Sequence, residues 1–206
     1  MVEGPLRERQ RRRSSLQHQK GNWCFMRRKN TTAQMMEGYI IEAMLLLLKE
    51  RRFADITVAD LTARAGVNRS TYYRHFETRE AVVDAYFESI MTAYRAAFAQ
   101  LETPSFGDYL YTMFAAFYVH RDQLLVLHAQ GLTARIGNAL RRQFGLDALV
   151  QHMTGSLEQR YKLAYHVGGV INSLLLWFDR GMVETPTQLA STTLAFLSAE
   201  SSSLFG

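Results

Sequence analysis

Hydrogen-bond donors crowd one short stretch of the chain, residues 69–75, and this stretch contains no acidic residue. Arginine, hydroxyl and histidine side chains of this kind bind the phosphates and base edges of DNA. The chemistry that they suggest is therefore recognition of a nucleic acid. The candidate DNA-binding side chains of this stretch are Arg69, Ser70, Thr71, Tyr73, Arg74 and His75.

Two short helices joined by a tight turn are expected to position these side chains. Thr57 is placed to cap the first of them, and Asp60 stands where a capping box needs its acid. Gly66 can adopt the positive φ that ends this helix. Asn68 or Ser70 can then start the second helix.

Tyr72 and Phe76 are the apolar residues that can anchor the second helix, since a spacing of four places them on one face. The pattern predicts a helix-turn-helix DNA reader, whose second helix enters the major groove. The alternative from spacing alone is an ordinary helical hairpin, because glycine-containing turns between helices are common.

A longer run favours the DNA reader. Residues 56–83 read ITVADLTARAGVNRSTYYRHFETREAVV. They resemble the DNA-binding domain of the tetracycline-repressor (TetR/AcrR) family, with a Thr opening the second helix, an A-G-V turn, a Tyr-x-His-Phe ending and a basic residue opening the fourth helix. The resemblance covers about residues 35–90.

This resemblance implies a role for each matching position. The residues expected to face base edges are Arg69, Ser70 and Thr71. The residues expected to contact phosphates are Thr57, Tyr73, His75 and Arg79. The chain departs from the family pattern at Arg52, where glycine is usual, and at Arg79, where lysine is usual.

Two segments, R-F-x-x-I-T-V over residues 52–58 and N-R-S-T-x-Y-R-H-F over residues 68–76, are similar to a subgroup that includes regulators of dihydroxyacetone-kinase operons. The carboxyl-terminal segment YHVGGVINSLLLWFDRGMVETPTQLA also resembles that subgroup. The resemblance carries no effector across.

The composition favours an all-α, globular protein. The chain has 206 residues, of which 48% are hydrophobic and only 3 are proline, and its apolar residues recur at helical spacing. Cys24 is the single cysteine, so an internal disulfide is excluded and a cytoplasmic location is expected. We expect no secretory signal, and the longest apolar run, around 167–178, is too short to span a bilayer.

Positive charge is concentrated at the amino terminus. Residues 1–30 hold nine Lys or Arg against two Glu, a net of +7, whereas the rest holds fifteen against seventeen acids, a net of −2. We interpret residues 1–30 as a disordered basic arm that attracts phosphates or enters a minor groove. The alternative is a translation start set too early, since Met26 opens the short basic lead MRRKN.

The expected organisation is a three-helix DNA-binding domain over 31–93 and an effector-binding and dimerisation domain over 94–206. The fourth helix, about 79–101, joins them mechanically. The first helix is expected over about 32–51. The later helices are expected at about 105–119, 122–130, 132–144, 147–156, 158–180 and 186–203.

No pattern for catalysis, a metal or a cofactor is found, because the histidines are scattered and no nucleophile or phosphate-loop motif is present. The second domain is expected to hold a mostly apolar effector pocket with a few polar groups. Its candidate lining residues are Phe117, His128, Tyr165, Asn172 and Trp177.

One wide apolar stripe is the candidate seam of a homodimer, with Gly168, Gly169 and Ser173 allowing close approach. The stripe contains Leu163, Val167, Val170, Ile171, Leu174, Leu175 and Phe178. The resemblance implies the same, since the last two long helices of the family form the dimer interface. The alternative is that the stripe is the core of a single subunit.

These observations together predict a dimeric regulator that binds a pseudo-palindromic operator in double-stranded DNA. The simplest form is a repressor that is released by a small-molecule effector. The alternative is a co-regulator or activator whose carboxyl-terminal domain binds a partner protein.

Overall fold

The computed structural model describes residues 33–143 and 156–198, and every regular element in those ranges is a helix. This confirms the all-α fold. The arm expected over 1–30 lies outside the described residues, as does the helix expected over 147–156 except for its last position. No helix in the described part of the chain is long and apolar enough to cross a membrane.

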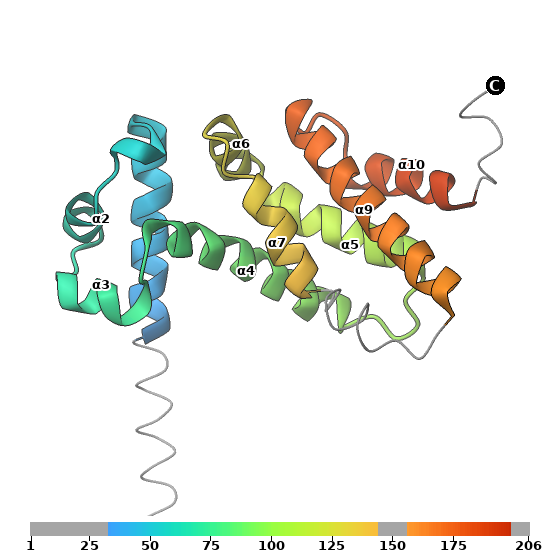
Figure 1. Ribbon diagram of the computed structural model, residues 1–206, viewed down its shortest axis with the longest axis horizontal. Coiled ribbons are helices and arrows are strands. Elements are labelled where there is room, and N and C mark those ends of the chain that lie inside the picture. Colours follow the sequence, from blue (N-terminus) through green and yellow to red (C-terminus); the bar gives the residue numbers. More distant parts are fainter. Residues whose placement is uncertain (1–32, 144–155, 199–206) are drawn as a thin grey trace, which may run out of the picture.

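The amino-terminal helices stand together at one end of the molecule (Figure 1). The first helix covers residues 33–50. It is followed by the 3-10 turn η1 (Phe53–Asp55), α2 (Val58–Ala65) and α3 (Arg69–His75). The long helix α4 (Arg79–Phe98) then runs out of this group into the rest of the protein (Figure 1).

Local capping explains where α2 and α3 begin and end. The Thr57 side chain accepts from the backbone N–H of Asp60, whose carboxylate accepts from the Thr57 backbone, so the predicted capping box is confirmed. Gly66 ends α2 with a φ of 66°, as predicted. Of the two candidates for the next cap, Asn68 is the one whose side chain accepts from the Thr71 N–H.

The first helix covers the helix-turn-helix with its apolar face. Tyr72 is fully buried and Phe76 is 5% exposed, so both anchor α3 as predicted. Burying two aromatic side chains of this size stabilises the unit by several kcal/mol. The other buried residues of this core are Ile40, Met44, Leu47, Leu48, Ile56, Leu61, Val82 and Val83.

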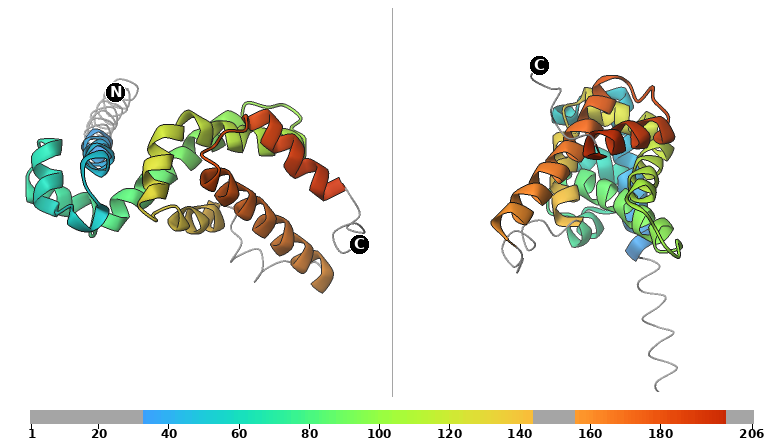
Figure 2. Two further views of the ribbon diagram at one scale, coloured as in Figure 1. Left: turned by 90° about the horizontal axis from the view of Figure 1, so that it is seen from above. Right: turned by 90° about the vertical axis from the view of Figure 1, so that its right-hand side faces the viewer.

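The remaining helices pack around the distal part of α4. They are α5 (Phe106–Val119), α6 (Arg121–Ala129), α7 (Ala134–Gln143), α9 (Leu157–Asp179) and α10 (Pro186–Ser198). Helix α5 packs against both α4 and α10, and α7 packs against α4. The molecule is elongated, with α9 and α10 at the end opposite the first helix (Figures 1 and 2).

Helix α4 ends three residues earlier than predicted. The N–H groups of Gln100 and Leu101 bond to carbonyls three residues back, at 3.2 and 3.1 Å, so the last turn tightens after Phe98. The next helix starts at the predicted Ser105, whose capping box with Asp108 is formed.

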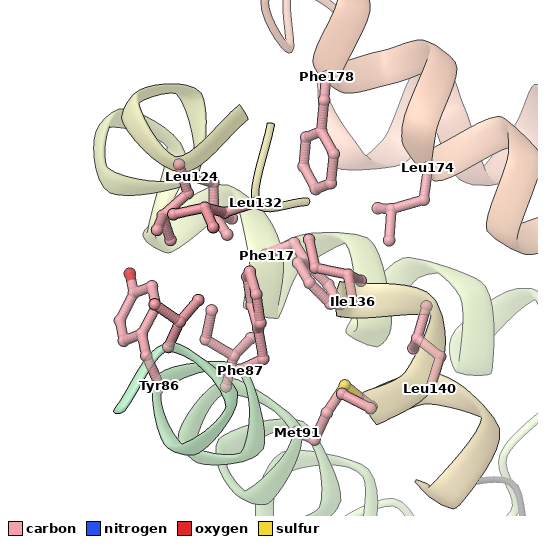
Figure 3. Packing of buried hydrophobic residues seen from close by; sticks show 14 of the residues in the cluster. Tyr86, Phe87, Met91, Phe117, Leu124, Leu132, Ile136, Leu140, Leu174 and Phe178 are labelled. Atoms are coloured by element: carbon pink, nitrogen blue, oxygen red, sulfur yellow. The ribbon is translucent and has the colours of Figure 1, made fainter. Parts of the chain in front are cut away.

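The apolar stripe of α9 lies mainly inside a single chain, and the prediction that it forms the dimer seam is therefore wrong for its buried members. Val170, Leu174 and Phe178 are at most 5% exposed and belong to the continuous core. Figure 3 shows Leu174 and Phe178 turned toward side chains of α4, α5 and α7. The side chain of Leu163 lies outside the described residues.

Candidate nucleic-acid interface

Helix α3 presents its polar side chains to solvent. Arg69, Ser70 and Arg74 are exposed, and Tyr73 is 57% exposed although its ring lies edge-on against the buried Tyr72 at 5.3 Å between centroids. The buried anchor thus fixes which face of α3 points outward. That face carries four of the residues which sequence reasoning selected as DNA contacts, namely Arg69, Ser70, Tyr73 and Arg74.

Some of these donors are already engaged within α3. The Ser70 hydroxyl donates to Asn68 Oδ1 at 2.8 Å, and an Arg74 N–H donates to Thr71 Oγ1 at 3.3 Å. Arg69 makes no side-chain hydrogen bond or ion pair with the described residues, so its guanidinium is free to reach a base edge. The structure thus leaves the Arg69 side chain exposed and available to an external partner.

Thr57 and Asp60 form a compact polar group at the start of α2. The Thr57 hydroxyl donates to Asp60 Oδ2 at 2.7 Å, and these hydrogen bonds hold the pKa of the Asp60 carboxyl below its usual range. The backbone N–H groups of this first turn are partly used by the box. Arg51 also reaches Asp60, at 3.3 Å between Nη1 and Oδ1.

His75 faces inward and ties α3 to the first helix. Its Nδ1 lies 3.1 Å from Glu37 Oε1, and its side chain is only 9% exposed. Sequence reasoning grouped His75 with the phosphate contacts. In the structure His75 positions the end of α3 against the first helix, and its phosphate contact stays a prediction.

Arg79 is also engaged inside the domain. Its Nη1 donates to the carbonyls of Phe53 and Ala54 at 3.3 Å each, and to the carbonyl of Ile56. Its guanidinium carbon lies 5.2 Å from the centroid of the Phe53 ring, a cation–π contact. Arg79 therefore joins the start of α4 to the turn before α2.

Sequence reasoning missed the ion pairs that fix α2 against the first helix. Arg64 Nη2 lies 2.5 and 2.7 Å from the two carboxylate oxygens of Glu50, in addition to the contact of Arg51 with Asp60. Both basic partners lie next to the DNA reader but are neutralised by acids. Glu50 and Arg64 are 14 residues apart, which is too far for the local sequence pattern to indicate their contact.

The five candidate effector residues do not gather around one space. Phe117 and Trp177 are each 1% exposed in the core, and the indole N–H of Trp177 donates to the Glu184 carbonyl at 3.1 Å. Tyr165 is 70% exposed and Asn172 is exposed as well. A pocket lined by all five is therefore not formed in this conformation.

His128, on α6, lies between the end of α9 and the turn before α7. Its Nε2 lies 3.0 Å from Asp179 Oδ1, and its Nδ1 lies 2.9 Å from Thr133 Oγ1. No group of three or more His, Cys, Asp or Glu residues that could hold a metal is found in the described ranges. Among the groups that the structure describes, His128 acts as a packing and hydrogen-bonding residue.

Comparison with known proteins agrees with this geometry. Residues 40–86 match the model of the family described as "Bacterial regulatory proteins, tetR family". They span most of the first helix, the helix-turn-helix and the first eight residues of α4. A comparison with curated protein sequences finds no match.

Among solved structures, the chain is similar to the TetR transcriptional regulator from Streptococcus agalactiae 2603V. The TM-score is 0.55 at 22% identity, and the alignment covers 82% of this chain and 97% of that one. The similarity shows that the fold extends through the carboxyl-terminal helices. Neither comparison names the dihydroxyacetone-kinase subgroup.

Proposed function

We propose that this chain, with its TetR-type helix-turn-helix, is a sequence-specific DNA-binding transcriptional regulator, and that it acts as a repressor released by a small-molecule effector. The observation that carries the proposal is α3 itself. It is anchored by a buried Tyr72 and exposes Arg69, Tyr73 and Arg74 without an acidic neighbour in the same helix. The family match over residues 40–86 supports the same assignment.

The roles that we propose for the interface residues follow from their exposure and their positions on the helices. Arg69 is unengaged and reads a base, while Tyr73 donates its exposed hydroxyl to a phosphate. Thr57 lies at the amino end of α2, where partial positive charge also favours a phosphate. Phosphate contacts of this kind orient α3 on the DNA without carrying sequence information.

A single short recognition helix reads only a few base pairs, so we propose that two copies bind together. The described part of α9 offers a face for this contact. Spacings of four and seven residues place an exposed row, apolar except for Asn172, along that helix, with the small Gly168 between its members. The row consists of Leu157, Tyr161, Tyr165, Asn172 and Leu176.

The proposed division of labour assigns residues 31–93 to DNA binding and 94–206 to dimerisation and effector response. Helix α4 belongs to both parts and would transmit a change between them. An effector can release the operator only if it binds the released conformation more tightly.

The sign of regulation is tested by transcription in vitro from a DNA fragment that the protein has selected, with and without the protein. A repressor lowers the transcript from a promoter that overlaps the site. An increase would instead favour an activator whose carboxyl-terminal domain binds a partner protein.

A further inference from the structure

The turn before α2 depends on a side chain from the other domain. The residue before η1, Arg52, makes no side-chain cap, because a guanidinium has no acceptor for a backbone N–H; it pairs with Asp55 at 3.1 Å. The backbone N–H of Phe53 donates instead to Gln130 Oε1 at 3.2 Å. Gln130 follows directly after α6, 77 positions along the chain from Phe53.

The side-chain amide nitrogen of Gln130 donates to carbonyl groups at the end of the first helix. Its Nε2 lies 3.5 Å from the carbonyls of both Leu48 and Arg51. Helix-terminal carbonyls lack partners within their own helix, so a donor here satisfies groups that would otherwise need water. One amide thus caps the end of the first helix and the start of η1 together.

Arg79 holds the opposite side of the same turn through the carbonyls of Phe53, Ala54 and Ile56. The turn is therefore clamped between α4, through Arg79, and α6, through Gln130. Only two residues, Ile56 and Thr57, separate the end of η1 from the start of α2, so a displacement of this turn should move the helix-turn-helix with it.

The last turn of α6 also reaches α9. His128, two positions before Gln130, contacts the Asp179 carboxylate at the carboxyl end of α9. Figure 1 shows α6 between the first helix and α9. One helical turn thus touches the end of α9 on one side and the DNA-binding domain on the other.

We propose that Gln130 is a positioning residue through which the carboxyl-terminal domain holds the orientation of the helix-turn-helix, by a route separate from α4. Movement at the α6–α9 contact would loosen the clamp on η1 and let the reader swing about the start of α4. The inference rests on the proposed function only for its consequence on DNA binding. The mechanical part concerns the free protein.

The test compares Gln130→Leu, which keeps the side-chain size but removes the amide, with Gln123→Leu, the same change on the first turn of α6. The first readout is hydrogen exchange of the Phe53 amide, measured by NMR. Loss of its acceptor should speed exchange roughly fivefold in Gln130→Leu alone, while amides in the middle of α4 keep their rates.

The second readout is a distance distribution between spin labels at Ala63→Cys on α2 and Val119→Cys on α5, with Cys24 replaced by serine. Both positions are exposed. Labelled protein is mixed with excess unlabelled protein, so that each measured pair lies within one chain. Gln130→Leu should broaden the distribution, and Gln123→Leu should leave it narrow.

An unchanged distribution and unchanged Phe53 exchange in Gln130→Leu would overturn the proposal. Gln130→Glu separates the two halves of the clamp, because it retains the acceptor for Phe53 but loses the donor to the carbonyls. It should protect Phe53 and still broaden the distribution. If the distance distribution broadens in Gln130→Leu but neither the unchanged protein nor any variant binds DNA, the positioning role stands and the proposed function fails.

Discussion

The carboxylate of Asp84 on α4 accepts two hydrogen bonds from the guanidinium of Arg135 on α7, at 2.7 and 2.6 Å. This geometry is the strongest form of a side-chain ion pair, and it raises the pKa of Arg135 through the hydrogen bonds with Asp84. The pair links α4, which extends from the helix-turn-helix, to α7, which packs against α4. It therefore fixes α4 in the carboxyl-terminal domain.

Asp84→Asn should lower the free energy of unfolding by about 1 kcal/mol, since both side chains keep about a third of their surface in water. Urea unfolding followed by circular dichroism measures the change. Glu42→Gln, at an exposed position of the first helix, is the control. Equal midpoints for the two variants would show that the ion pair contributes nothing.

The second prediction separates reading from positioning on α3. Arg69→Ala should flatten the preference at one base pair of each half-site, at a cost of roughly 1–3 kcal/mol in discrimination. Tyr73→Phe should weaken binding to all sequences alike, because it removes only a phosphate donor. Binding of both variants to a panel of single-base operator changes distinguishes them. If Tyr73→Phe altered the base preference and Arg69→Ala did not, the two roles would be exchanged.

The third prediction concerns pH. The Ser105 side-chain and backbone hydrogen bonds hold the pKa of Asp108 below its usual value of 3.8. A carboxyl whose pKa is lower in the folded protein adds stability above its unfolded pKa and loses it as pH falls through the folded value. Asp108→Asn should thus lower the melting temperature at pH 7. The deficit should vanish in acid, once Asp108 is protonated in both states, and a deficit that persists unchanged at low pH would contradict this origin.

Local signals in the sequence were sufficient for the boundaries of α2 and the start of α5. Thr57 with Asp60, Gly66 and Ser105 act within three or four residues of their targets, so their spacing alone predicts the caps. The same is true of the anchors Tyr72 and Phe76. Contacts within a few residues therefore predicted these helix caps and the anchoring of α3.

Contacts between distant segments were not predictable in this way. The spacing of Val170, Leu174 and Phe178 shows that one face of α9 is buried, but the covering helices are set by tertiary packing. The contacts from Gln130 to Phe53 and from Glu37 to His75 have no local signature. The effector residues were chosen by type, and residue type does not distinguish a pocket from a core.

The fourth prediction places the dimer contact on the exposed row of α9. Tyr165→Asp should give monomers that remain folded, because Tyr165 is 70% exposed in the single chain. Val170→Asp should instead unfold the protein, since an unpaired carboxylate at a position that is 5% exposed costs several kcal/mol. Sedimentation and circular dichroism report both outcomes.

Val119→Asp is the matched control, at an apolar position of α5 that is 80% exposed. It should leave the dimer intact. A Tyr165→Asp protein that stays dimeric, or a Val119→Asp protein that dissociates, would place the contact elsewhere.

The central claim is that two copies of the chain bind DNA together, each through the exposed face of its α3. Selection of bound sites from random DNA by the full-length protein tests this claim most directly. The account predicts enrichment of one short motif in two inverted copies, with Arg69→Ala losing the preference at one symmetric position. It also predicts that Tyr165→Asp loses affinity for the paired site but not for a single copy. Recovery of no enriched motif, or of a motif indifferent to Arg69, would contradict the account.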